Sequence, residues 1–116
     1  MDRDAKLINN ILSYCGSIED ILDEFNRDHE EFTKRSSFQF ACSFCIEQIG
    51  HNAEMLDPKL REKYSDLNWD GMVGLRVDIA HFYEIQNIDV IWDTVTKKVP
   101  RIRKVCEKIL YDLTKR

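Results

Sequence analysis

The chain has 116 residues, of which 43% are hydrophobic and 33% charged, with only 4 glycines and 2 prolines. This length and balance predict one globular domain over residues 1–116 and exclude a disordered or proline-rich linker protein. A formal net charge of −4 argues against a nucleic-acid-binding protein that relies on overall positive charge. No stretch approaches the roughly 20 apolar residues of a membrane-spanning helix or forms a signal peptide, so we expect a cytoplasmic protein with no membrane partner.

The first half of the chain shows helical spacing of apolar residues. A helix is expected over 4–14, and its apolar stripe continues over 17–25 after a break or bend at Gly16-Ser17. A third helix is expected over 33–56 and ends at Asp57-Pro58, because proline disfavours helical backbone in the residue before it.

The expected third helix is apolar on two sides. One side carries Phe38, Ala41, Cys42, Cys45, Ile49 and Leu56, and the other carries Phe40, Phe44 and Ile46. A helix with two apolar faces is either central in its fold or shared with a partner chain.

The second half predicts a short helix after Pro58, a fourth helix capped by Asn68 or Asp66, and a last helix over 88–113. Pro100 should kink or split the last helix near Val99. Antiparallel packing of these segments gives an all-α, up-and-down bundle of four to five helices.

Cys42 and Cys45 form a C-x-x-C within an apolar helical run, and Cys15 and Cys106 are isolated in the sequence. A thioredoxin-type motif would follow a strand, and a zinc site would need two further ligands at compact spacing. We therefore expect four buried thiols and no metal site.

The last helix carries a basic strip, defined as Lys97, Arg101, Lys104 and Lys108, opposite its apolar stripe. The strip is either an ordinary solvated face or a surface that contacts RNA phosphates.

Arg76, Asp78, His81 and Tyr83 form the chemically richest segment. Arginine binds phosphoryl oxygens through a fixed fork of donors, and histidine transfers protons near neutral pH, so this pair could cleave RNA without a metal. Five helical residues correspond to about 140° of rotation, which separates Arg76 from His81 on a continuous helix. The two side chains can still act together in three ways. The helix ends near His81, or the long arginine side chain extends to the His81 side of the helix, or two chains contribute their residues to one site. Asp78 could orient the His81 imidazole.

The segments WDGMVGLR (69–76), IAHFY (79–83) and VIW (90–92) resemble the HepT branch of the HEPN superfamily, which carries a tryptophan, an "lR…iaH.Y" motif and a "vW". Residues 49–56 resemble a further family segment. The likeness extends from the first helix to Leu113.

The resemblance implies a homodimeric, HEPN-like helical bundle with a cleft at the dimer interface. It implies a metal-independent endoribonuclease that needs no cofactor and acts as the toxin of a toxin–antitoxin pair. Arg76 and His81 would be the catalytic residues. The partner would be an MNT-type nucleotidyltransferase antitoxin that adenylylates Tyr83.

Val77 and Phe82 depart from the family pattern, which commonly has a polar residue after the arginine and glycine after the histidine. An alternative is therefore a catalytically inactive dimeric module that binds a nucleotidyltransferase or a nucleotide.

Overall fold

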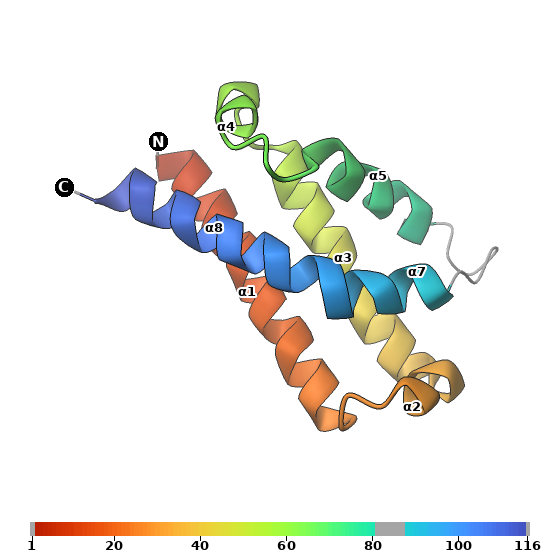
Figure 1. The fold of residues 1–116 in the computed structure, drawn as a ribbon. Coiled ribbons are helices and arrows are strands. Elements are labelled where there is room, and N and C mark those ends of the chain that lie inside the picture. The colour runs from red at the N-terminus through yellow and green to blue at the C-terminus, as the bar shows by residue number, and fades with distance from the viewer. Residues whose placement is uncertain (1, 81–87, 116) are drawn as a thin grey trace.

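The computed structural model describes residues 2–80 and 88–115, with residues 2 and 75–80 described by their backbone alone. Every regular element in this part of the chain is a helix, which confirms the all-α prediction. The molecule is elongated, with extents of 47 × 27 × 20 Å. Figure 1 shows two long helices of the first half running side by side, with the C-terminal helical segments lying across them. No helix of the described part is long and apolar enough to cross a membrane.

Helix α1 (Asp2–Glu24) runs without interruption through Gly16-Ser17, which excludes a break there, the first of the two expected alternatives. The reason is that Ile18 and Leu22 extend the buried stripe of Ile11 and Cys15 along the same side. Tertiary burial here outweighs the weak helix propensity of glycine. The chain instead turns after α1 at Asn26 and Arg27, which both have positive φ.

The prediction of one helix over 33–56 is wrong at its start, because that helix begins later and a separate short helix precedes it. Helix α2 (His29–Lys34) is capped by Asp28, and α3 (Ser36–Glu54) follows after one residue. Arg35 separates them with extended backbone at φ −109° and ψ 111°. Its guanidinium contacts Glu31 at 2.7 Å, and Gln39 donates a hydrogen bond to the Phe32 carbonyl across the bend.

Helix α3 is central, as one of the two sequence interpretations requires. Helix α1 packs along one side of it and α5 (Trp69–Ala80) along another, while α2 and α7 (Ile88–Asp93) lie against it as well (Figure 1). The expected second apolar face is only partly exposed: Phe40 and Phe44 are each 56% exposed, whereas Ile46 is buried.

A short helix and three side-chain hydrogen bonds hold the segment that leads into α5 and the first turn of α5. Helix α4 (Pro58–Lys63) begins as expected after Asp57, whose side chain accepts from the Lys59 N–H. Tyr64 then donates to Asp112 at 2.7 Å, and the Trp69 indole donates to the Tyr64 carbonyl at 2.9 Å. Asn68 caps α5 by accepting from the Gly71 N–H, so the first of the two expected caps is the observed one.

The last helix is split near Val99, as predicted. Helix α7 leads into a π-helical turn, η1 (Thr94–Lys98), and then into α8 (Val99–Thr114). Pro100 has no N–H to offer the helix, and the Val99 N–H bonds instead to the Thr94 carbonyl five residues back. The helical segments therefore stay connected, and the turn at η1 contains one residue more than an α-helical turn.

All four cysteines are buried free thiols, which confirms that prediction. Burial raises the pKa of Cys15, Cys42 and Cys106 to about 12, and it raises the pKa of Cys45 as well. A thiol with such a pKa holds almost no thiolate at neutral pH, so these side chains are packing residues.

We expect the native protein to react with a thiol reagent such as Ellman's reagent only at the rate of its unfolding. Neutral, buried thiols are poor nucleophiles, whereas urea should expose all 4 cysteines of the chain at once. The measurement is the absorbance time course at pH 7 with and without urea. A fast native phase of one thiol or more would contradict this account.

The glycines of α5 give a matched pair of variants. A Cβ on Gly71 would lie 2.6 Å from the Asn68 amide nitrogen and displace the cap, whereas a Cβ on Gly74 meets nothing within 4 Å. We expect Gly74→Ala to stabilise the protein by about 0.5–1 kcal/mol, because alanine favours the helix. Gly71→Ala should be less stable than Gly74→Ala by about 1 kcal/mol, the cost of a lost cap. Urea denaturation measures both, and equal free energies of unfolding would disprove the role of the cap.

Candidate functional site

Helix α5 carries the first part of the predicted catalytic motif. Arg76 and Asp78 lie in its last two turns, and the described helix continues to Ala80. His81 and Tyr83 lie outside the described residues, as does Phe82. Arg76 and Asp78 are two residues apart, so about 200° of rotation places them on different sides of α5.

The start of α5 is fixed more firmly than helix propensity alone would achieve. Trp69 and Met72 are buried, and the Asn68 cap and the Trp69 indole bond hold the first turn. Arg76 follows Met72 by one helical turn, at a register position on the same side of the helix. The anchoring of Met72 therefore sets the rotation of α5 that presents Arg76.

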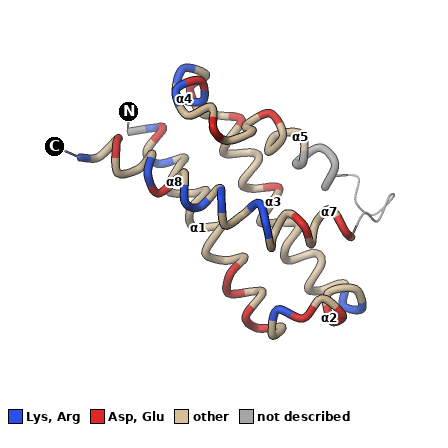
Figure 2. The backbone as a smooth tube through the Cα atoms, viewed as in Figure 1, with Lys and Arg blue, Asp and Glu red and all other residues tan. Residues whose placement is uncertain are grey.

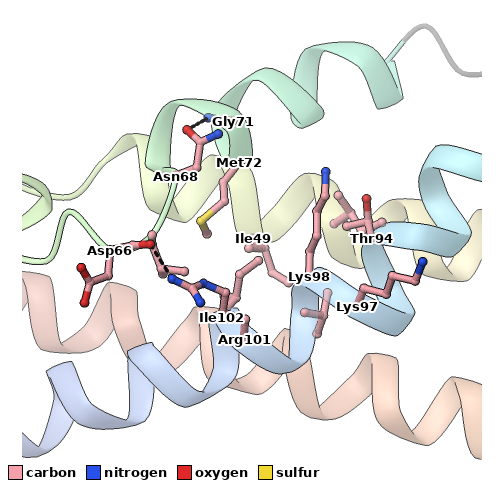
Figure 3. Close-up of a pocket in the computed structure, with 13 residues that line it drawn as sticks. Ile49, Asp66, Asn68, Gly71, Met72, Thr94, Lys97, Lys98, Arg101 and Ile102 are labelled. Carbon is pink, nitrogen blue, oxygen red and sulfur yellow. Dashed lines mark hydrogen bonds between the residues drawn. The ribbon is translucent and has the colours of Figure 1, made fainter.

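A pocket of about 300 Å³ opens beside this anchored turn, between α3, α5, η1 and α8. We call it the α5–α8 pocket (Figure 3). Its lining residues are Ile46, Ile49, Asp66, Leu67, Asn68, Gly71, Met72, Thr94, Lys97, Lys98, Val99, Arg101 and Ile102. Apolar side chains from α3, α5 and α8 form most of its walls, so the pocket is a water-accessible gap in the core.

Cationic side chains from η1 and α8 stand at the edge of the pocket. The Arg101 guanidinium donates to the Asp66 carbonyl at 2.8 Å, which ties α8 to the loop before α5 (Figure 3). Lys97 pairs with Asp93 at 3.3 Å. Lys98 forms no ion pair with any residue that the structure describes, and its ammonium reaches toward α5. Lys98 is thus the cation at this edge with the fewest competing contacts.

The predicted basic strip is a surface feature of η1 and α8. Lys97, Arg101, Lys104 and Lys108 are all exposed, and the buried Val99, Ile102, Cys106 and Ile109 occupy the inner side. Figure 2 shows the Lys and Arg positions recurring along this helix. The structure brings Lys97 and Arg101 to the α5–α8 pocket, whereas Lys104 and Lys108 do not line it.

Sequence reasoning missed Lys98 as a member of this site. The strip was defined with the 3.6-residue period of an α-helix, and η1 is a π-helical turn with a longer period. Pro100 was the available signal, because a proline inside a helical pattern disturbs the register of the residues before it. Among the described residues, no group of three His, Cys, Asp or Glu side chains could hold a metal ion.

The chain is similar over most of its length to proteins named as putative or probable ribonucleases. The family model described as "Ribonuclease HepT-like" matches residues 11–109. "Putative RNase MJ0125" of Methanocaldococcus jannaschii is 31% identical over 112 residues, which cover 96% of this chain and 95% of that protein. "Putative RNase MJ0127" of the same organism is 35% identical over 84% of this chain and 81% of its own length.

A third relative, "Probable ribonuclease HepT" of Thermococcus cleftensis, is 25% identical over 78% of this chain and 84% of its own length. No solved structure matches the chain. The family match includes α5 and the whole Arg76–Tyr83 segment, as the resemblance of those residues had indicated. The chain therefore belongs to the HepT-like ribonuclease family.

Proposed function

We propose that the chain is a metal-independent endoribonuclease and the toxin of a HepT–MNT type toxin–antitoxin pair. The observation that carries the proposal is the family match over residues 11–109, a range that includes Arg76, His81 and Tyr83. The anchored first turn of α5 supports it, because a rigid helix is a suitable carrier for a catalytic arginine.

The proposed reaction is an intramolecular transesterification of RNA. His81 removes the proton of a 2′-hydroxyl, and the 2′-oxygen attacks the adjacent phosphorus and expels the 5′-oxygen of the next nucleotide. Arg76 stabilises the negative charge that gathers on the phosphoryl oxygens. The leaving 5′-oxygen takes up one proton, which balances the one that His81 removes, so the products are a 2′,3′-cyclic phosphate and a 5′-hydroxyl. Asp78 is proposed as a positioning residue for the imidazole.

A homodimer is part of the proposal. The rotation of about 140° between Arg76 and His81 on a continuous helix is overcome if two motifs face one another across a two-fold axis. The surface of α3 at Phe44 is a candidate for the interface, because this side chain is 56% exposed and its ring forms a T-shaped pair with Tyr14.

The proposed antitoxin is an MNT-type nucleotidyltransferase that transfers AMP to Tyr83. An added nucleotide would bring negative charge and bulk to the motif where a substrate phosphate would bind, and like charges would then repel the RNA. Lys97, Arg101, Lys104 and Lys108 are proposed as further phosphate contacts, since all four are exposed on one helix.

The second candidate is a non-catalytic dimeric module that binds a nucleotidyltransferase or a nucleotide. Val77 and Phe82 favour it, because they replace a polar and a small residue of the family motif. The two candidates differ in one observable property, which is cleavage of RNA by the purified chain.

We expect the wild-type protein to cut a mixed RNA pool in EDTA and His81→Ala to lose at least about a hundredfold in rate, because general base catalysis contributes about that much or more. Arg76→Ala should lose a similar factor. Gel analysis and detection of the cyclic phosphate are the measurements. The control is Lys6→Ala, an exposed residue on α1. Equal cutting by wild type and His81→Ala would reject this assignment, and no cutting by the unmodified dimer would favour the second candidate.

The dimer is tested by light scattering at micromolar concentration. We expect wild type to show twice the chain mass of 13.8 kDa. Phe44→Asp should shift it toward the monomer, because a charge in an apolar interface is left unpaired. Tyr111→Asp serves as the matched control, since Tyr111 is 66% exposed on α8. A monomeric wild type would contradict the shared-cleft mechanism, and a dimer unaffected by Phe44→Asp would place the interface elsewhere.

A further inference from the structure

The α5–α8 pocket combines an apolar interior with cations at its edge. Ile49 of α3, Met72 of α5 and Ile102 of α8 converge on it from three helices, while Lys97 and Lys98 extend from η1 (Figure 3). The Asp66 carboxylate, in contrast, points away from the pocket, and only the backbone carbonyl of that residue meets Arg101. The arrangement suits a ligand with an apolar body and a nearby negative charge.

The pocket lies directly beside α5, the helix that carries Arg76. Met72 lines it, and Arg76 follows Met72 by one helical turn, a rise of about 6 Å along α5. A phosphodiester bound at Arg76 would therefore have its neighbouring nucleotide within reach of the pocket. Two further hollows of the described surface are formed without Met72, so this proximity separates the α5–α8 pocket from both of them.

One polar group at the mouth has unused hydrogen-bonding capacity. The Asn68 side-chain oxygen accepts from the Gly71 N–H at 2.9 Å, whereas the amide nitrogen donates to no residue that the structure describes. An amide donor at the edge of an apolar pocket can meet the acceptors on the rim of a nucleobase that enters the pocket.

We propose that the α5–α8 pocket receives the base of one unpaired nucleotide of the RNA substrate, with the adjoining phosphate on Lys98. This inference rests on the proposed ribonuclease function and adds a subsite to it. Single-stranded RNA is recognised through splayed bases that pack on protein side chains and through phosphates that pair with cations. Lys98 is the suitable cation for this phosphate because its ammonium reaches toward α5, whereas Arg101 also donates to the Asp66 carbonyl and Lys97 also pairs with Asp93.

The charge pattern of the molecule supports an RNA occupant. The net charge is −4, yet the acidic residues gather along the C-terminal part of α1, whereas Lys and Arg recur along η1 and α8 next to the pocket (Figure 2). Local positive potential on an acidic protein directs an anionic ligand to one surface.

The decisive experiment is an NMR spectrum of methionine methyl groups in the presence of RNA. The chain has 3 methionines, of which Met72 lines the pocket and Met55, outside its lining, is an internal control. The protein is His81→Ala labelled on the methionine methyl carbon, and the probe is a short unstructured oligoribonucleotide of mixed sequence. We expect the ring current of the inserted base to shift the Met72 signal while the Met55 signal stays in place.

A second measurement tests the phosphate contact. Lys98→Ala in the His81→Ala background should weaken binding of the same oligoribonucleotide and reduce the slope of log affinity against log salt by about 0.7, the value for one phosphate contact on a single strand. Lys6→Ala is the matched control and should leave the slope unchanged, since Lys6 lies on α1. An unchanged slope in Lys98→Ala would overturn the assignment of this lysine.

The outcomes distinguish the pocket from the enzyme. RNA cleavage by wild type together with an unmoved Met72 signal at saturating RNA would reject the pocket and leave the ribonuclease intact. A Met72 shift in a chain that does not cut would support the pocket and reject the ribonuclease. If 5′-AMP shifts the Met72 signal and the oligoribonucleotide does not, the pocket takes a free nucleotide. The proposal would then be wrong.

Discussion

The need to cover the apolar surface of α3 is the constraint on which the rest of the structure depends. Helices α1 and α5 pack along it, and α2 and α7 add to the cover. Burial of these side chains is the main favourable term in folding. One polar contact fixes the register: the Asn10 amide donates to Asn52 at 3.0 Å inside the α1–α3 contact, and Asn52 donates to the Gln48 carbonyl. Because such a pair is satisfied only in one alignment, sliding α1 along α3 would leave polar groups unpaired.

The position of α5 follows from that of α3, and the catalytic proposal follows from α5. Trp69 and Met72 bury against the core, and the Tyr64 phenol links the loop before α5 to Asp112 of α8. Burial and the acceptor Asp112 raise the pKa of Tyr64 to about 12. Its contribution to stability is therefore complete below the usual pKa near 10 and is lost as pH rises toward 12. At neutral pH the Tyr64–Asp112 contact is intact. Helix α5 is then held by its cap at Asn68 and by the link from the loop before it to α8.

The π-helical turn η1 links a local defect to a surface property. Pro100 withholds one N–H, the helix accommodates this with a longer turn, and the lysines there are rotated relative to an ordinary α-helix. Lys98 thereby reaches the α5–α8 pocket while Val95 and Val99 remain buried. An acidic protein can in this way offer RNA a local basic surface without a basic composition.

The sequence by itself determined the helical class, the choice of Asn68 or Asp66 as the cap of α5, the start of α4 at Asp57-Pro58 and the burial of the cysteines. These features depend on the apolar period and on side chains that bond their own neighbours, and both are local properties. The Arg76–Tyr83 motif was also visible in the sequence, because spacing is a property of one segment. Only the tertiary structure decided that α1 continues through Gly16, that Ile46 is buried, and that a pocket opens between α5 and α8. Each of these outcomes depends on which distant segment covers a given face, and that is set by the packing of all the helices together.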